Sequence, residues 1–194
     1  MSDILKQIDK VRQQLKRGVA DRLLMQQPFA EGMYRFSMFI IDYYSRVREN
    51  LKLDYDSFMI IQTVVSHTLY QMNKQKKSGT SYSELNKEWE AVINYDEPEI
   101  LYHVSNFRSN LKQKLTISSI CLITKLPKET VRRKANELSK ANLLKISKKE
   151  GIILGPNYRK VFQDFVPNTT LEVSKLLKVW EKNGVLKGLL TFRL

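Results

Sequence analysis

Apolar residues recur at spacings of three and four residues along most of this chain, which is the pattern of amphipathic helices. Two such stripes are expected to lie inward, one of Met33, Phe36, Ile40, Tyr43 and Val47 and one of Phe58, Ile61, Val65, Leu69 and Met72. Seven Gly and five Pro among 194 residues are too few for a turn-rich all-β chain. The β signal is local, in "LKIS" (144–147) and "IILG" (152–155), so the sequence predicts a mainly α fold with one β-hairpin.

The charge of the chain is strongly positive and unevenly distributed. Lys and Arg number 33 against 20 Asp and Glu, which gives a net charge of +13 and a pI near 9.7. Between Arg108 and Gly151, twelve basic and three acidic residues give a net charge of +9. Such a concentration favours a polyanionic partner, either nucleic acid or an anionic membrane surface, and indicates that the partner binds this segment.

The segment "LPKETVRRKANELSKANLL", residues 126–144, has a helical spacing with a mostly basic outer side. At about 3.6 residues per turn, the inward side is expected to hold Val131, Ala135, Leu138 and Asn142. The opposite side then holds Glu129, Arg132, Arg133, Asn136 and Lys140. Arg, Asn and Glu are the residue types that pair with the edges of guanine, adenine and cytosine. We therefore interpret this segment as a helix that enters a nucleic-acid groove.

The segments on either side of this helix complete a compact motif. Upstream, "LTISSICLIT" is expected to form a short helix capped near Thr116, with Ile117, Ile120, Cys121 and Ile123 as candidates for its buried side. "TKL" then makes a tight turn, and Pro127 starts the basic helix. Downstream, the hairpin carries Lys148 and Lys149 at its tip. A helix, a short turn, a second basic helix and a hairpin form the winged helix-turn-helix arrangement.

The stretch "ISSICLITKLPKETVRRKANELSKANLLKISKKEGIILG" resembles the winged helix-turn-helix domains of bacterial transcriptional regulators, broadly of the multiple-antibiotic-resistance regulator (MarR) or GntR type. The resemblance covers roughly residues 99–156. It implies DNA-binding residues at Lys128, Glu129, Thr130, Arg132, Arg133 and Asn136, and in the wing at Lys148 and Lys149. Thr116 and Ser118, at the start of the preceding helix, are further candidate DNA-binding residues. The turn of these domains commonly has Gly where this chain has Lys125, for which a left-handed backbone is strained. Cys121 stands where the first helix commonly has Ala.

These patterns predict a mainly α chain in three parts. Residues 1–95 form a helical region for dimerisation or for effector or partner binding, residues 96–156 the winged helix-turn-helix domain, and residues 157–194 C-terminal helices at a dimer contact. The predicted function is a sequence-specific DNA-binding transcriptional regulator, with a recognition helix at about 127–141 in the major groove of double-stranded DNA and a basic wing on the backbone. Two alternatives remain open: a winged-helix protein-interaction adaptor, and an RNA-binding or plasmid replication factor.

The residues that catalysis or metal binding would need are sparse. Cys121 is the single cysteine, and His67 and His103 have no second ligand at a suitable spacing. No Ser/His/Asp or Cys/His constellation stands out, so we expect no enzyme, no cofactor and no metal site. No apolar run is long enough to cross a bilayer, and "MSDILKQIDKVRQQLKRG" has acidic residues and no continuous apolar region. We therefore expect no membrane association. The single cysteine cannot form a disulfide within the chain, so we expect a reducing, cytoplasmic location.

Apolar helices that flank the basic segment are suited to self-association. A short seam at the start of the chain is formed by Ile4, Ile8, Val11 and Leu15. A last helix, capped by Thr169 or Thr170 and ended by Gly184, carries Val173, Leu176, Leu177 and Trp180, and one short helix is expected between Pro156 and Pro167. We expect a homodimer that reads half-sites about 34 Å apart. A monomer whose ends fold back on its own core, and a small-molecule effector bound by the aromatics from Phe29 to Tyr44, stay open.

Overall fold

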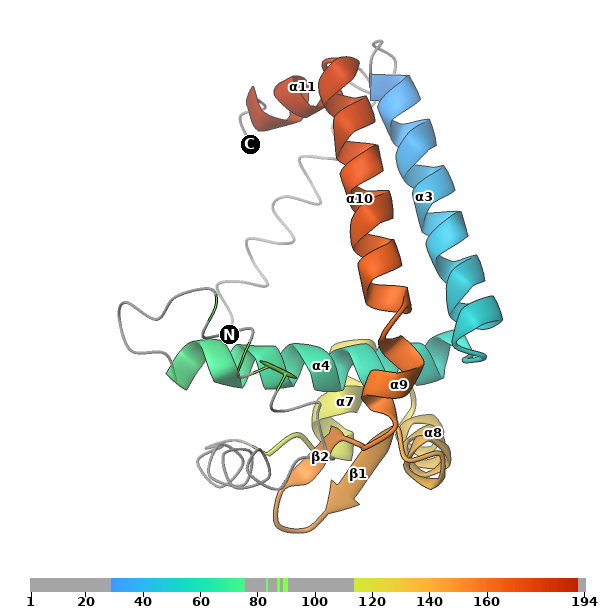
Figure 1. Cartoon of the computed structure of the whole chain (residues 1–194). Coiled ribbons are helices and arrows are strands. Elements are labelled where there is room, and N and C mark those ends of the chain that lie inside the picture. The colour runs from blue at the N-terminus through green and yellow to red at the C-terminus, as the bar shows by residue number, and fades with distance from the viewer. Residues whose placement is uncertain (1–28, 76–82, 84–86, 88, 91–113, 192–194) are drawn as a thin grey trace. The chain divides into compact units, whose positions relative to one another are not determined.

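The computed structural model describes residues 29–75, 83, 87, 89–90 and 114–191. The elements within them are α3 (Phe29–Asn50), α4 (Tyr55–Gln75), α7 (Ile117–Thr124), α8 (Lys128–Lys140), β1 (Leu144–Ser147), β2 (Gly151–Leu154), α9 (Tyr158–Phe162), α10 (Phe165–Lys182) and α11 (Val185–Thr191) (Figure 1). The expected mainly helical chain with a small antiparallel two-stranded sheet is confirmed. The predicted seam from Ile4 to Leu15 and the residue His103 lie outside the described residues.

The chain divides into two compact units. One, the α3–α10 unit, comprises Met1–Ser45 and Pro167–Leu194, and the other, the α4–α8 unit, is Arg46–Val166. No described helix is both long enough and apolar enough to span a membrane.

Helix α4 lies at the centre of the α4–α8 unit, where it packs against α7, α8 and β2. Its predicted stripe is correct for Phe58, Ile61 and Met72, which are buried, but Leu69 is exposed. Ile60 and Val64 are completely buried as well, because α4 meets partners on more than one side and therefore buries a face wider than one stripe. The rings of Phe58 and Phe162 stack with centroids 6.4 Å apart, which joins α4 to α9.

Helix α7 begins at the predicted cap and ends in the predicted turn, where Lys125 takes the left-handed backbone that is strained for lysine. The Thr116 hydroxyl caps it by accepting a hydrogen bond from the Ser119 amide at 3.2 Å. Lys125 ends it in a left-handed conformation, with φ 61° and ψ 15°, and its amide donates to the Cys121 carbonyl. The prediction that Ile123 is buried is wrong: Ile120 is fully buried, whereas Ile123 is 62% exposed. An eight-residue helix has one narrow inward face, and α7 presents Ile120 on it.

The hairpin after α8 has the predicted position, with one difference in the second strand. Leu144 pairs with Leu154 and Ser147 with Gly151, so β2 begins at Gly151 and ends one residue before Gly155. Gly151 also forms a parallel bridge with Leu115, and the Ile152 amide donates to the Leu115 carbonyl at 2.9 Å. Leu115, two residues before α7, therefore extends the edge of the hairpin, a contact that no sequence pattern predicted.

In the α3–α10 unit, Trp180 of α10 packs against α3. Its indole Nε1 donates to the Gly32 carbonyl at 3.1 Å, and its ring centroid lies 6.2 Å from that of Phe36. Gly32 is needed here because a Cβ at this position would come within 2.6 Å of the Val185 side chain. The predicted inward stripe of α3 is wrong at Met33 and Phe36, which are 43% and 38% exposed, and correct at Val47, which is fully buried.

The predicted start of the last helix is wrong. Helix α10 begins at Phe165, so Pro167 lies in its first turn, and Thr169 and Thr170 lie inside the helix. Proline is tolerated there because the first amides of a helix have no carbonyl partner within it. The predicted end is correct, since α10 stops at Lys182 and Gly184 adopts a φ of +75°.

Candidate nucleic-acid interface

Helix α8 buries one stripe and exposes the rest of its surface. Val131, Ala135 and Leu138 are buried at spacings of four and three, as predicted. Asn142 does not continue this stripe. The Leu143 amide donates to the Leu138 carbonyl at 2.9 Å, and Asn142 takes a left-handed conformation with φ 57° in the turn that ends the helix. The inward face of α8 therefore ends at Leu138, and Asn142 is exposed.

The two arginines of the predicted groove-facing surface are exposed and are paired within the helix. Arg132 Nη2 lies 2.9 Å from Glu129 Oε1, and Arg133 Nη1 lies 2.8 Å from Glu137 Oε1. The side chains of Arg132 and Arg133 are 63% and 56% exposed. Ion pairs this exposed contribute on the order of 0.2–1 kcal/mol, so a phosphate or a base edge can displace the carboxylates at little cost.

The remaining predicted residues of α8 differ in exposure. Lys128 and Asn136 are exposed, and Thr130 is half-buried. Neither Lys128 nor Lys140 makes an ion pair with another described residue. These two lysines are therefore available to an anionic partner without any rearrangement.

The predicted wing lysines lie in the turn between β1 and β2. Lys148 and Lys149 are both exposed. Lys114, which was not among the predicted site residues, donates from its Nζ to the Lys148 carbonyl at 3.2 Å. The structure thus brings a third lysine to this turn. Its signal in the sequence was the basic character of the segment before Thr116, but its proximity to the hairpin depends on the bridge between Leu115 and Gly151.

The two predicted residues at the start of α7 differ in how they are engaged. The Thr116 hydroxyl is 3.0 Å from that of Ser119 in addition to capping the helix, whereas Ser118 is exposed. The first amides of α7 and these hydroxyls can meet a phosphate oxygen, because helix N-termini favour anions. Thr116 therefore has a structural role that is independent of any ligand.

Positive charge dominates the segment that carries these residues. Ten basic and three acidic residues between Lys114 and Gly155 give a net charge of +7. Two of the acidic residues, Glu129 and Glu137, are the partners of the arginines on α8. The excess charge therefore resides mainly on lysines, which suits contact with a phosphate backbone.

Lys134 is the exception among the basic residues of α8. Its Nζ lies 2.6 Å from Asp54 Oδ2 at the start of α4, and its side chain is only 15% exposed. Burial opposes ionisation of Asp54, but hydrogen bonds from Lys134 and Ser57 outweigh it and lower the pKa of Asp54 from 3.8 to about 2. The hydrogen bond to Asp54 raises the pKa of Lys134. This pair could not be predicted, because no sequence pattern links residues 80 positions apart.

A second candidate site lies in the α3–α10 unit. A cleft of about 310 Å³ is lined by Arg35, Met38, Phe39, Asp42, Glu172, Lys175, Leu176 and Val179. Phe39 is the aromatic residue of the predicted effector region that lines it. The volume is at the low end for small-molecule sites, so the effector stays a prediction. Among the described residues, no group of three or more His, Cys, Asp or Glu side chains is placed to hold a metal ion.

Comparisons of this chain with protein-family models, with curated proteins and with solved structures find no match. What the basic surface does has to follow from its own residues and their chemistry.

Proposed function

We propose that this chain is a sequence-specific DNA-binding transcriptional regulator, and that residues 114–155 act as a winged helix-turn-helix domain. The observation that carries the proposal is the exposed surface of α8, with Lys128, Arg132, Arg133 and Lys140, next to a hairpin whose turn holds Lys148 and Lys149. The order α7, α8, β1, β2 supports it, because a short helix, a turn, a basic helix and a hairpin is the element order of such domains.

In the proposed complex, the N-terminal half of α8 lies in the major groove. Arg132 and Arg133 contact guanine or phosphate, Glu129 can accept from cytosine, and Asn136 pairs with adenine if it reaches the base. Lys128, Lys148 and Lys149 contact phosphates, which positions the protein without specifying sequence. Arg132 exchanges its glutamate partner for DNA on binding, whereas Arg133 keeps Nη1 on Glu137 and contacts DNA through its other guanidinium nitrogens.

The proposed regulator acts as a homodimer, because one such domain covers too few base pairs for specificity in a genome. Exposed apolar side chains in the α3–α10 unit support self-association: Met38 and Ile41 on α3, and Leu171, Val173 and Leu177 on α10. Trp180, a predicted contact residue, is hydrogen-bonded to Gly32 of its own chain and is a poorer candidate. Sedimentation at micromolar concentration should show a dimer, and a single 22.8 kDa species bound to DNA one molecule per site would contradict it.

The direct test is selection of duplexes by the full-length protein from a random pool, followed by measurement of affinity across salt concentrations. We expect enrichment of a palindromic site and a steep loss of affinity with salt, because bound lysines and arginines release counterions from the phosphates. Arg133→Ala should cost about 1–3 kcal/mol on the selected duplex if Arg133 reads a base. An affinity that barely changes with salt would contradict the groove model.

A protein-interaction adaptor is the second candidate, and one observation favours it. Leu122 and Ile123 on α7 are 71% and 62% exposed, an apolar pair that DNA binding does not require. Binding of the protein to duplex DNA, duplex RNA and single strands separates the candidates. An adaptor would bind all three equally weakly, and an RNA-binding or replication factor would prefer RNA or single strands.

A further inference from the structure

Lys134 differs from its neighbours on α8 because its ammonium group pairs with a residue outside the helix. Arg132 and Arg133 extend into solvent, whereas the Lys134 side chain lies at the edge of the buried stripe and reaches the start of α4. Its ammonium group is already compensated by the carboxylate of Asp54 at 2.6 Å. A lysine compensated in this way is a poor phosphate ligand, because its side chain is only 15% exposed and a phosphate would have to displace the carboxylate that already neutralises it.

Asp54 is itself fixed in place. Its Oδ1 accepts a hydrogen bond from the Ser57 amide, and its Oδ2 accepts one from the Ser57 hydroxyl, both at 3.0 Å. This caps α4, whose first intrahelical bond runs from the Phe58 amide to the Asp54 carbonyl at 2.9 Å. The preceding Leu51 is buried, so the loop that carries Asp54 is anchored on both sides. The carboxylate is therefore a rigid point to which α8 can be attached.

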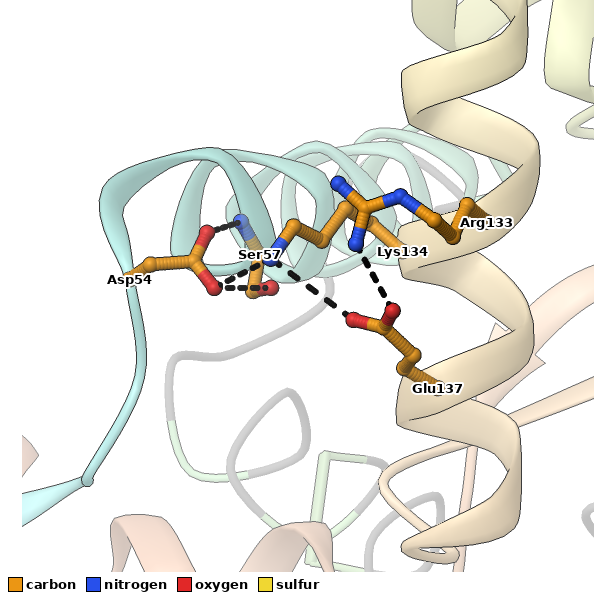
Figure 2. A network of polar contacts seen from close by, with 5 residues as sticks. All are labelled: Asp54, Ser57, Arg133, Lys134 and Glu137. Carbon is orange, nitrogen blue, oxygen red and sulfur yellow. Dashed lines mark hydrogen bonds and ion pairs between the residues drawn. The ribbon is translucent and has the colours of Figure 1, made fainter.

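The network continues from Lys134 to a residue of the proposed groove surface. Lys134 Nζ lies 3.6 Å from Glu137 Oε2, and the other oxygen of the same carboxylate, Oε1, holds Arg133 Nη1 at 2.8 Å. Figure 2 shows the five residues along this path of contacts, from Ser57 and Asp54 through Lys134 to Glu137 and Arg133. A path of polar contacts thus leads from the cap of α4 to a guanidinium on the outer face of α8.

We propose that Lys134 is a positioning residue, an inference that rests on the proposed function. Lys134 attaches α8 to the start of α4 and, through Glu137, fixes the side chain of Arg133 for base reading. It does not contact DNA. A helix that turns or slides slightly against its support misplaces every base-reading side chain at once, and a long arginine side chain held in one conformation loses less entropy on binding.

The test is Asp54→Asn, which retains a capping oxygen and removes the negative charge that holds Lys134. If Asp54 acted on DNA binding only through its charge, this more positive variant would bind DNA more tightly. If Lys134 positions α8, the variant should lose preference for a duplex selected by the wild type over a scrambled duplex of equal length. This ratio of affinities should fall by roughly threefold or more, the scale of coupling within one polar network. Lys134→Met should lose preference to the same extent, and the double variant no more than either single one.

The matched control is Asp56→Asn, which makes the same charge change in the first turn of α4, where Asp56 has no ion pair with another described residue. It should leave the preference unchanged. The slope of log affinity against log salt should also stay unchanged in Lys134→Met, because a lost phosphate contact would lower it by about one.

Three results overturn the inference. If the Asp54→Asn variant keeps its preference for the selected duplex over the scrambled one, α8 needs no attachment to Asp54. A lower salt slope in Lys134→Met shows that Lys134 contacts phosphate. Both results leave the proposed function standing if the wild type discriminates between the duplexes. A wild type without any preference overturns the proposed function, and the positioning role with it.

Discussion

Arg132 Nη2 lies 2.9 Å from Glu129 Oε1 on the exposed side of α8, so an arginine proposed to contact DNA is partly neutralised by a glutamate one turn away. In the proposed complex, Glu129 can accept a hydrogen bond from cytosine. The ion pair gives Glu129 a second role, as a competitor that the nucleic acid has to displace.

Glu129→Gln should therefore raise affinity for a scrambled duplex, by roughly two- to fivefold at low salt, because it frees Arg132 and removes a negative charge beside the phosphates. Glu181→Gln on α10 makes the same charge change outside the α4–α8 unit and should have little effect. Fluorescence anisotropy with labelled duplexes measures both. A loss of affinity confined to sites with one particular cytosine would mean that Glu129 reads that base.

The lysines of the hairpin turn should act on all DNA sequences alike. Lys148→Ala and Lys149→Ala are each expected to lower affinity for the selected and the scrambled duplex by the same factor, and to reduce the salt slope by about one. The matched control is Lys178→Ala, an exposed lysine of α10. A change in the preferred sequence would mean that the turn reads bases in the minor groove.

The ion pair between Asp54 and Lys134 should make part of the free energy of unfolding depend on pH. The pKa of Asp54 is lowered to about 2 in the folded chain, so the unfolded chain binds the proton more readily and stability falls as pH drops through about 4 to 2. At pH 7, Asp54→Asn should be less stable than the wild type by about 1 kcal/mol, a value reduced for solvent exposure. Urea unfolding between pH 7 and pH 2 should show this gap closing, and a gap that is constant with pH would contradict the assignment.

Two glycines with a positive φ allow a matched test of the hairpin. A Cβ at Gly151 would meet the Leu115 carbonyl oxygen at 2.5 Å, whereas at Gly184 nothing lies within 4 Å. Gly184→Ala should cost only the backbone strain, about 1–2 kcal/mol. Gly151→Ala should cost clearly more, because the bridge to Leu115 has to open as well. Equal losses of unfolding free energy would mean that this bridge contributes little.

Much of the α4–α8 unit was predictable because its signals are local. The cap at Thr116, the tight turn after α7, the buried stripe of α8 and the position of the hairpin each depend on residues close in sequence. The errors occurred where burial depends on distant partners. Ile123 is apolar but 62% exposed, and Asn142 follows the helical spacing beyond the point where the helix ends.

The sequence by itself determined the helical composition, the hairpin, and the concentration of positive charge on α8 and on the turn between β1 and β2. The reason is that periodicity, capping and charge are properties of neighbouring residues. Only the tertiary structure decided which of those charges face solvent. Arg132, Arg133 and Lys134 are consecutive in sequence, yet two extend outward and the third is held by Asp54. The physical reason is that a carboxylate 80 residues away is brought to Lys134 by the packing of α4 against α8.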